Sequence, residues 1–200
     1  MQNKIIILFL ATLLAFSLNT SELKAQESDS LYHVNFDFGI GPAMYLTNMN
    51  YENLYGSYPF VVTFRFMWQP EHLLRLGIEA GYLPLFYLET KFYDTVFGDT
   101  EAELSLNSIP IMGVFAMEIV ENFEISGGIG GFILISEVTS FNNYIVNFSW
   151  SNAYELGFSY LHPLSKKFKI GGEVKSYYIT KLENYDLVLH LAFRYTLFSY

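Results

Sequence analysis

Cysteine is absent from the 200-residue sequence, so no disulfide, thiolate nucleophile, lipidated cysteine or zinc–sulfur site can form. Positive charge is scarce, because 11 Lys and Arg stand against 20 Asp and Glu, for a formal net charge of −9. This balance argues against nucleic acid as a partner and against a polybasic membrane-surface patch. Beyond residue 25, no apolar run approaches the roughly 20 residues that a membrane-spanning helix needs.

The first 25 residues have the layout of a secretory signal peptide. Lys4 precedes an unbroken apolar run over residues 5–16, and Ala25 supplies a small residue before a cut ahead of Gln26. The apolar run is too short to cross a bilayer comfortably. We therefore expect residues 1–25 to be removed, residues 26–30 to form a short N-terminal segment, and residues 31–200 to fold.

Apolar residues are abundant in the part that folds. They make up 52% of the chain, with 19 Phe and 16 Tyr. Near the C-terminus, Leu187, Leu189 and Leu191 alternate with polar or small neighbours that include His190 and Arg194. Strict alternation over about ten residues is typical of a transmembrane β-strand, with one face toward lipid and the other toward the lumen.

The same alternation recurs along the chain and predicts an all-β, eight-stranded antiparallel up-and-down transmembrane barrel. The segment at 104–117 is the least regular, because Pro110 and apolar residues on both faces suggest a bulge there. Connections alternate between short ones, expected in the periplasm, and mostly longer outer loops at 47–57, 85–103 and 136–148, with 181–186 as the short exception. The eight predicted strands span residues 32–40, 58–68, 74–82, 104–117, 123–135, 150–160, 168–178 and 187–197.

Charged residues share the face that lies opposite the apolar rows. A soluble barrel would bury all of them in an apolar core at high cost, which favours the membrane interpretation. Eight strands leave an interior that side chains just fill, so these charges should pair and close the lumen. A gated proton or ion path is the alternative. The predicted lumen network is Asp37, Arg65, Arg75, Glu79, Glu155, Glu173, Lys175 and Arg194.

Aromatic residues gather near the predicted strand ends, where amphipathic rings suit the headgroup level of a membrane. The predicted girdle is Tyr32, Trp68, Tyr160 and Phe168 on the periplasmic side and Tyr58, Tyr82 and Tyr178 on the outer side.

The predicted outer loop at 85–103 is both acidic and aromatic. It suits a solvated loop that meets surface glycans through divalent ions, and equally a recognition loop, because aromatic side chains often anchor binding surfaces. Both interpretations remain open. The candidate recognition residues are Phe92, Tyr93, Asp94, Phe97 and Asp99.

The chain resembles known families in two respects. Residues 187–200 are similar to the terminal strand of bacterial outer-membrane barrels, which the barrel-assembly machinery reads. The glycine-rich residues 127–131, the Ser108-Ile109-Pro110-Ile111 segment and the cut before Gln26 resemble the PorT-like outer-membrane family of Bacteroidota. That resemblance implies a small barrel, with a role in secretion or gliding for a few members and unknown activity for most.

The four histidines show no metal-ligand spacing, and we expect neither metal nor cofactor. His190 should face the lumen, where it could act as a general base for Ser151 or serve as a further hydrogen-bonded plug residue. We expect a non-enzymatic barrel that supports the envelope or docks an envelope protein, in contact with outer-membrane lipid and lipopolysaccharide. A lipid A-modifying enzyme and a narrow channel for small apolar solutes are the alternatives.

Overall fold

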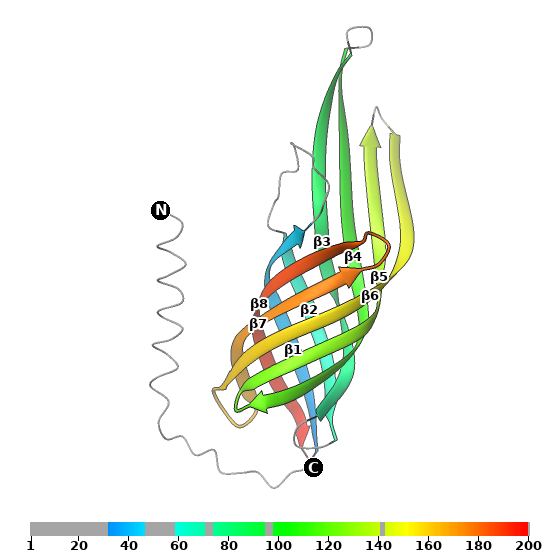
Figure 1. Cartoon of the computed structure of the whole chain (residues 1–200). Helices are drawn as coiled ribbons and strands as arrows, with labels where there is room; N and C mark the ends of the chain where they lie inside the picture. Colours follow the sequence, from blue (N-terminus) through cyan, green and yellow to red (C-terminus); the bar gives the residue numbers. More distant parts are fainter. Residues whose placement is uncertain (1–31, 47–58, 71–73, 95–97, 141–142, 200) are drawn as a thin grey trace.

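The chain forms one closed antiparallel barrel of eight strands, as the alternation predicted (Figure 1). The computed structural model describes residues 32–46, 59–70, 74–94, 98–140 and 143–199. Each strand pairs with the next along the chain, and β8 returns to pair with β1. The strands are β1 His33–Leu46, β2 Phe60–Gln69, β3 Leu74–Asp94, β4 Gly98–Val120, β5 Phe123–Ser140, β6 Asn143–Pro163, β7 Phe168–Ile179 and β8 Asn184–Ser199.

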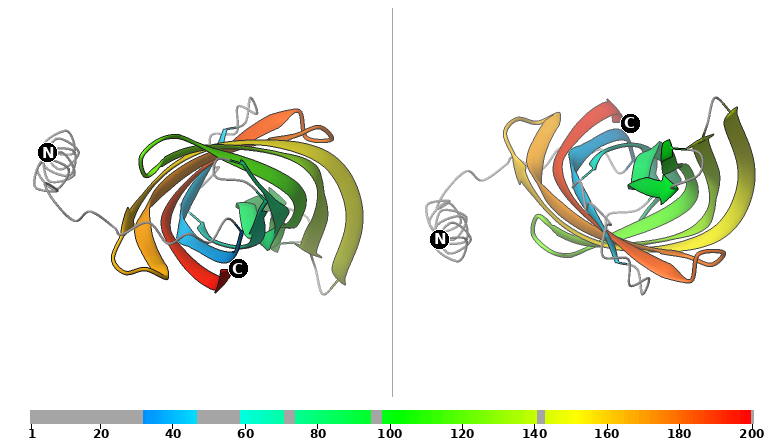
Figure 2. Two further views of the ribbon diagram at one scale, coloured as in Figure 1. Left: turned by 90° about the horizontal axis from the view of Figure 1, so that it is seen from below. Right: turned by 90° about the horizontal axis from the view of Figure 1, so that it is seen from above.

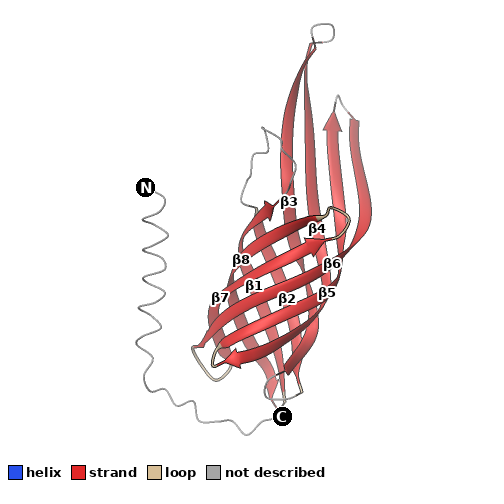
Figure 3. Cartoon of the chain, in the orientation of Figure 1, coloured by secondary structure: helices blue, strands red, loops and turns tan. Residues whose placement is uncertain are grey.

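The described residues are strands joined by turns (Figure 3), and views along the barrel show the sheet wrapping around a central lumen (Figure 2). No helix within these described residues is long and apolar enough to cross a membrane.

The two faces of the sheet differ as the sequence indicated. In β8, Leu187, Leu189 and Leu191 are exposed, whereas Val188 and His190 are buried. Successive side chains point to opposite faces of a strand, so a period of two in the sequence becomes an apolar exterior and a filled interior. This sidedness suits a barrel surrounded by lipid.

Four strands run well beyond the rest of the barrel on one side (Figure 1). Pairing of β2 with β3 ends at Val62 and Tyr82, and pairing of β6 with β7 ends at Ala153 and Ile179. Past these points β3 to β6 still pair with one another. We call residues 83–94, 98–108, 134–140 and 143–151 the outer extension.

The outer extension shows that two loop predictions were wrong. Most of residues 85–103 and of residues 136–148 is strand, with Glu89 opposite Glu103 and Val138 opposite Ile145. The acidic residues of segment 85–103 suggested a solvated loop, but a strand that is exposed to water can carry polar groups on both faces. The aromatic and β-branched residues of these segments favour strand.

Pro110 does not mark a bulge, contrary to the expectation for β4. Pairing of Ala80 with Ile111 and of Leu83 with Ser108 follows one unbroken register on either side of the proline. The irregularities lie instead in β3 between Pro84 and Phe86 and at the end of β4 between Glu118 and Val120. The residues facing Pro110 from β3 make no ladder pair, so the missing N–H of proline is tolerated there.

The two ends of the barrel differ in their connections. At the end opposite the outer extension, β4 and β5 are joined by residues 121–122 and β6 and β7 by residues 164–167. Asn122 adopts a φ of 67°, the left-handed conformation that a tight turn requires. Short turns face the periplasm in outer-membrane barrels, so we call this end the periplasmic mouth.

Candidate functional site

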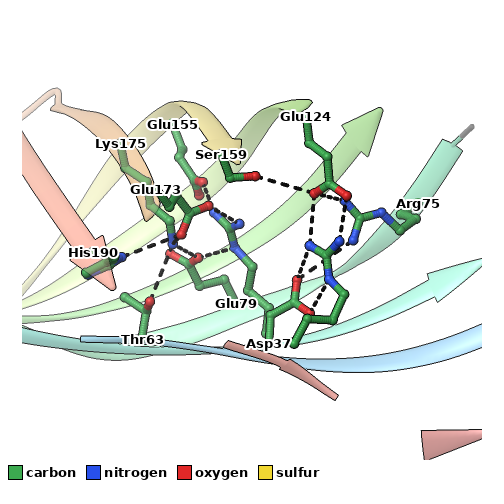
Figure 4. A network of polar contacts seen from close by, with 12 residues as sticks. Asp37, Thr63, Arg75, Glu79, Glu124, Glu155, Ser159, Glu173, Lys175 and His190 are labelled. Atoms are coloured by element: carbon green, nitrogen blue, oxygen red, sulfur yellow. Dashed lines mark hydrogen bonds and ion pairs between the residues drawn. The ribbon is translucent and has the colours of Figure 1, made fainter. Parts of the chain in front are cut away.

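A cluster of ionic side chains fills the middle of the lumen (Figure 4). Arg65 on β2 contacts three carboxylates: Nη1 lies 2.6 Å from Oε1 of Glu173, while Nε and Nη2 meet Glu79 and Glu155. Lys175 Nζ lies 2.5 Å from Oε2 of Glu79 and 3.4 Å from Oε2 of Glu173. We call these five residues the central cluster.

Neutral groups complete the central cluster. The Tyr177 hydroxyl donates to Oε1 of Glu79 over 2.5 Å, and the Lys175 ammonium reaches the Thr63 hydroxyl at 3.4 Å. Arg65, Glu79 and Lys175 are almost completely buried. Charges this far from water persist only when partners surround them, and these contacts supply the partners.

A second group of ion pairs lies nearer the periplasmic mouth. Arg194 on β8 binds Asp37 through Nε and Nη2 and binds Glu124 through Nη1, the last at 2.5 Å. Arg75 on β3 pairs with Glu124, and its Nη1 lies 3.9 Å from Asp37. These four residues, the mouth cluster, balance two positive against two negative charges.

An apolar layer closes the lumen on the other side of the central cluster. Val61, Leu83, Phe132 and Ile179 are fully buried there. The ring of Phe132 meets that of Tyr177 edge-on, with the ring centroids 5.5 Å apart. Tyr177 therefore joins the two layers, because its ring packs in the apolar one while its hydroxyl bonds to the ionic one.

Little free space remains between the central cluster and the mouth cluster. A crevice lined by Arg65, Glu173 and Arg194 has a volume of about 10 Å³, which is room for a single water molecule. In the part of the chain that the structure describes, ionic and apolar layers together fill the middle of the lumen.

All eight residues predicted for the lumen network lie in these two clusters, and the structure divides them into separate groups. Sequence reasoning missed Glu124 as a member of the network, although the alternation already placed it on the inner face of its strand. It also missed the Tyr177 hydroxyl. The signal that could have identified Glu124 is its negative charge at an inward-facing position of the strand predicted at 123–135.

His190 and Ser151 do not form a catalytic pair. His190 Nδ1 lies 3.6 Å from Oε2 of Glu173, whereas the Ser151 hydroxyl lies 3.1 Å from the Asn152 carbonyl oxygen and 3.4 Å from the Thr180 hydroxyl. No hydrogen bond joins the two residues within the described ranges. Among those ranges there is also no group of three or more side chains suited to a metal ion.

Most of the predicted girdle residues that the structure describes lie near strand ends, but Tyr82 lies inside β3, at the point where its pairing with β2 ends. Tyr32, Trp68 and Tyr82 are exposed, and Tyr160, Phe168 and Tyr178 are half-buried. The rings of Tyr160 and Phe123 pack at a tilt of 48°, with the ring centroids 4.7 Å apart. Tyr58 lies outside the described residues.

The predicted recognition residues belong to the end of the outer extension. Phe92, Tyr93 and Asp94 lie in β3 and Asp99 lies in β4, with Tyr93 opposite Asp99 in the register. Phe97 lies outside the described residues. The structure therefore places the described ones on a β-hairpin.

Together, the closed sheet, the apolar exterior and the ion-paired lumen define an integral outer-membrane β-barrel. No family model matches the sequence, and no curated protein matches it either.

The chain is similar in structure to Ail, the attachment invasion locus protein of Yersinia pestis. The TM-score is 0.51 and the identity 13%, with 84% of this chain and 99% of Ail covered. Neisserial surface protein A matches with a TM-score of 0.48 and 10% identity over 86% of this chain and 100% of that one. OprG of Pseudomonas aeruginosa matches with a TM-score of 0.46 and 15% identity over 86% and 99%. At 13% identity, the likeness to Ail shows the shared fold.

Proposed function

We propose that this protein is a non-enzymatic outer-membrane barrel, closed to solutes, that docks a protein partner through the outer extension. The observation that carries the first half is the filled lumen, with its crevice of about 10 Å³. Purified barrel in a planar bilayer should show no steady conductance. A steady conductance at neutral pH would contradict a closed barrel.

The edge of β6 supports the docking half of the proposal. Within the described residues, no strand pairs with residues 143–151 on the side away from β5. An open edge offers backbone donors and acceptors to an extended segment of another chain, which can add as a further strand.

One face of that edge is apolar, with Tyr144, Val146, Phe148 and Trp150, and the other carries Ile145 beside Asn147 and Ser149. Tyr144 and Ile145 point to opposite faces and are 63% and 61% exposed, and Phe148 is 66% exposed. Exposed apolar groups beside an open edge favour association over solitary exposure to water.

The outer extension is also acidic, which favours a partner segment with positive charge. Along its four strands, acidic residues outnumber the single lysine, Lys91. The acidic residues are Glu89, Asp94, Asp99, Glu101, Glu103 and Glu137.

A substitution on β6 tests the docking half directly. The triple variant Tyr144→Ser, Ile145→Ser and Phe148→Ser removes the three most exposed apolar side chains of this edge and keeps its backbone. Proteins recovered after cross-linking on intact cells should be lost from this variant and retained in the control Asn147→Ser. Equal recovery from both variants would contradict docking at this edge.

The finer assignments rest on the sequence. We infer that residues 1–25 are a signal peptide, that the barrel-assembly machinery inserts residues 31–200 after the short segment 26–30, and that the girdle residues meet lipid and lipopolysaccharide. The resemblance to the PorT-like family of Bacteroidota supports a role in secretion or gliding. Comparing the secreted proteins of a deletion strain and its parent tests this role, and identical sets would contradict a role in secretion.

A further inference from the structure

The periplasmic mouth of the barrel holds a cavity. Its volume is about 190 Å³, and residues of β1 to β5, β7 and β8 and of the turn between β6 and β7 line it. At roughly 30 Å³ for each water in the liquid, this is room for several water molecules or for one small polyatomic ion. It lies at the opposite end from the outer extension, so its ligand is independent of the proposed function.

The cations around this cavity come from separate elements. Arg75 on β3 and Arg194 on β8 belong to the mouth cluster, and Lys169 on β7 and Lys166 in the preceding turn also line the cavity. Only 3% of Arg75 is exposed; its Nη2 pairs with Glu124, whereas its Nη1 lies 3.9 Å from Oδ2 of Asp37 and makes no hydrogen bond within the described residues.

The carboxylates that line the cavity are already engaged, whereas its lysines are not. Glu118 Oε1 accepts a hydrogen bond from the Asn122 N–H over 2.8 Å, and Glu124 pairs with both arginines. Among the described residues, no ion pair or hydrogen bond involves the ammonium group of Lys166 or of Lys169. The residues that line the cavity carry four Lys or Arg against two Glu, a local excess of positive charge in a chain with a formal net charge of −9.

We propose that the mouth cavity binds a phosphate-type oxyanion between the Arg75 guanidinium and the ammonium groups of Lys166 and Lys169. A phosphate group carries more charge than a carboxylate and offers three or more acceptor oxygens, which matches one planar donor group and two point charges. Free phosphate and the phosphate of a lipid headgroup share this chemistry, and the two sources are separable by experiment.

The turn between β6 and β7 supplies a matched control for the test. Lys167 sits between the two lysines in sequence and does not line the cavity. Barrel purified in zwitterionic detergent, at fixed ionic strength, is titrated calorimetrically with inorganic phosphate. The variant Lys166→Gln/Lys169→Gln should bind phosphate about tenfold more weakly, because two partly exposed ion pairs are lost. The control Lys167→Gln should bind within about twofold of the wild type.

Two further titrants define the ligand. Acetate should bind about tenfold more weakly than phosphate, since it has one charge and two oxygens. The headgroup analogue glycerophosphoglycerol distinguishes the sources: binding at least as tight as that of phosphate assigns a lipid headgroup, and weaker binding assigns free phosphate. The proposal is overturned by the absence of saturable phosphate binding, by acetate binding as tightly, or by an equal loss of binding in Lys167→Gln. The shift of folded barrel on unheated electrophoresis verifies that each variant is folded.

Discussion

The Arg194 guanidinium binds the Asp37 carboxylate where the last strand, β8, pairs with the first, β1. Nε lies 2.7 Å from Oδ1 and Nη2 lies 2.8 Å from Oδ2, and the two residues are direct cross-strand partners in the β1–β8 register. A two-pronged guanidinium–carboxylate contact is both strong and directional. It therefore stabilises the closing register of the barrel, where the strands that meet are farthest apart in sequence.

Removing one member of this pair should destabilise the barrel. Asp37→Ala leaves Arg194 short of one of its two carboxylate partners in a buried site, with an expected cost of about 3 kcal/mol in the free energy of unfolding. Urea unfolding in lipid vesicles measures this cost. The double variant Asp37→Leu/Arg194→Met replaces the pair with apolar groups and should recover part of the loss. A double variant no more stable than Asp37→Ala would argue against the pair as the cause.

Removing Arg65 should weaken both stability and closure. Arg65→Ala leaves Glu79, Glu155 and Glu173 close together with only Lys175 to compensate, with an expected cost of about 3–5 kcal/mol. The repelling carboxylates should draw water into the lumen, so planar-bilayer recordings should show cation-selective current that the wild type lacks. Arg65→Lys keeps the charge but not the three-way contact, and it should give an intermediate stability. A silent Arg65→Ala barrel would mean that the apolar layer and the mouth cluster seal the lumen without Arg65.

The apolar layer should matter for stability through packing. Phe132→Ala removes a fully buried ring that meets Tyr177, with an expected cost of about 3–5 kcal/mol. The outward-facing Phe158 is 52% exposed, so Phe158→Ala should cost less when unfolding is measured in the same lipid. The Phe132→Ala barrel should remain electrically silent, because both ionic clusters are intact. Current through this variant would contradict closure by the ionic clusters.

Substitution of Gly131, on the outer face, should show whether the Trp150 ring covers this glycine. A Cβ added at Gly131 would lie 2.1 Å from Cζ2 of Trp150, so Gly131→Ala must displace that ring. The chain has two tryptophans, and in a Trp68→Phe background the emission of Trp150 should shift, with a loss of about 1–2 kcal/mol in stability. Gly113→Ala is the matched control, since the nearest atom to its added Cβ is 3.5 Å away. Unchanged Trp150 emission in Gly131→Ala would show that the ring does not lie over the glycine.

The face of the sheet on which each side chain lies could be predicted from the sequence, because it is a local property of the strand. Side chains alternate along a strand whatever the strand pairs with, so Leu189 beside His190 already separates the exterior from the lumen. The number of strands and the direction of the barrel follow from repeating this pattern and from the lengths of the connections. The same logic put Arg65 and Glu155 on the inner face.

Strand length was not accessible in the same way. The residues around Glu89 and those around Glu103 are strand because they pair with one another as the two arms of a hairpin. No local sequence pattern separates such a strand from an acidic loop. Pro110 led to the wrong prediction of a bulge beside it in β4. A proline is tolerated at this position because β3 makes no ladder pair opposite it, and that gap is visible only in the folded sheet.

By itself, the sequence determined which residues enter the lumen, because inward placement needs only the alternation of side chains along one strand. Only the tertiary structure decided which of them meet: Arg65 reaches Glu155, 90 positions away, and Glu124 joins Arg194. Those meetings depend on the stagger between strands as the sheet closes, and that stagger is a property of the whole barrel. The same closure brings Lys166, Lys169 and Arg75 to the wall of one cavity.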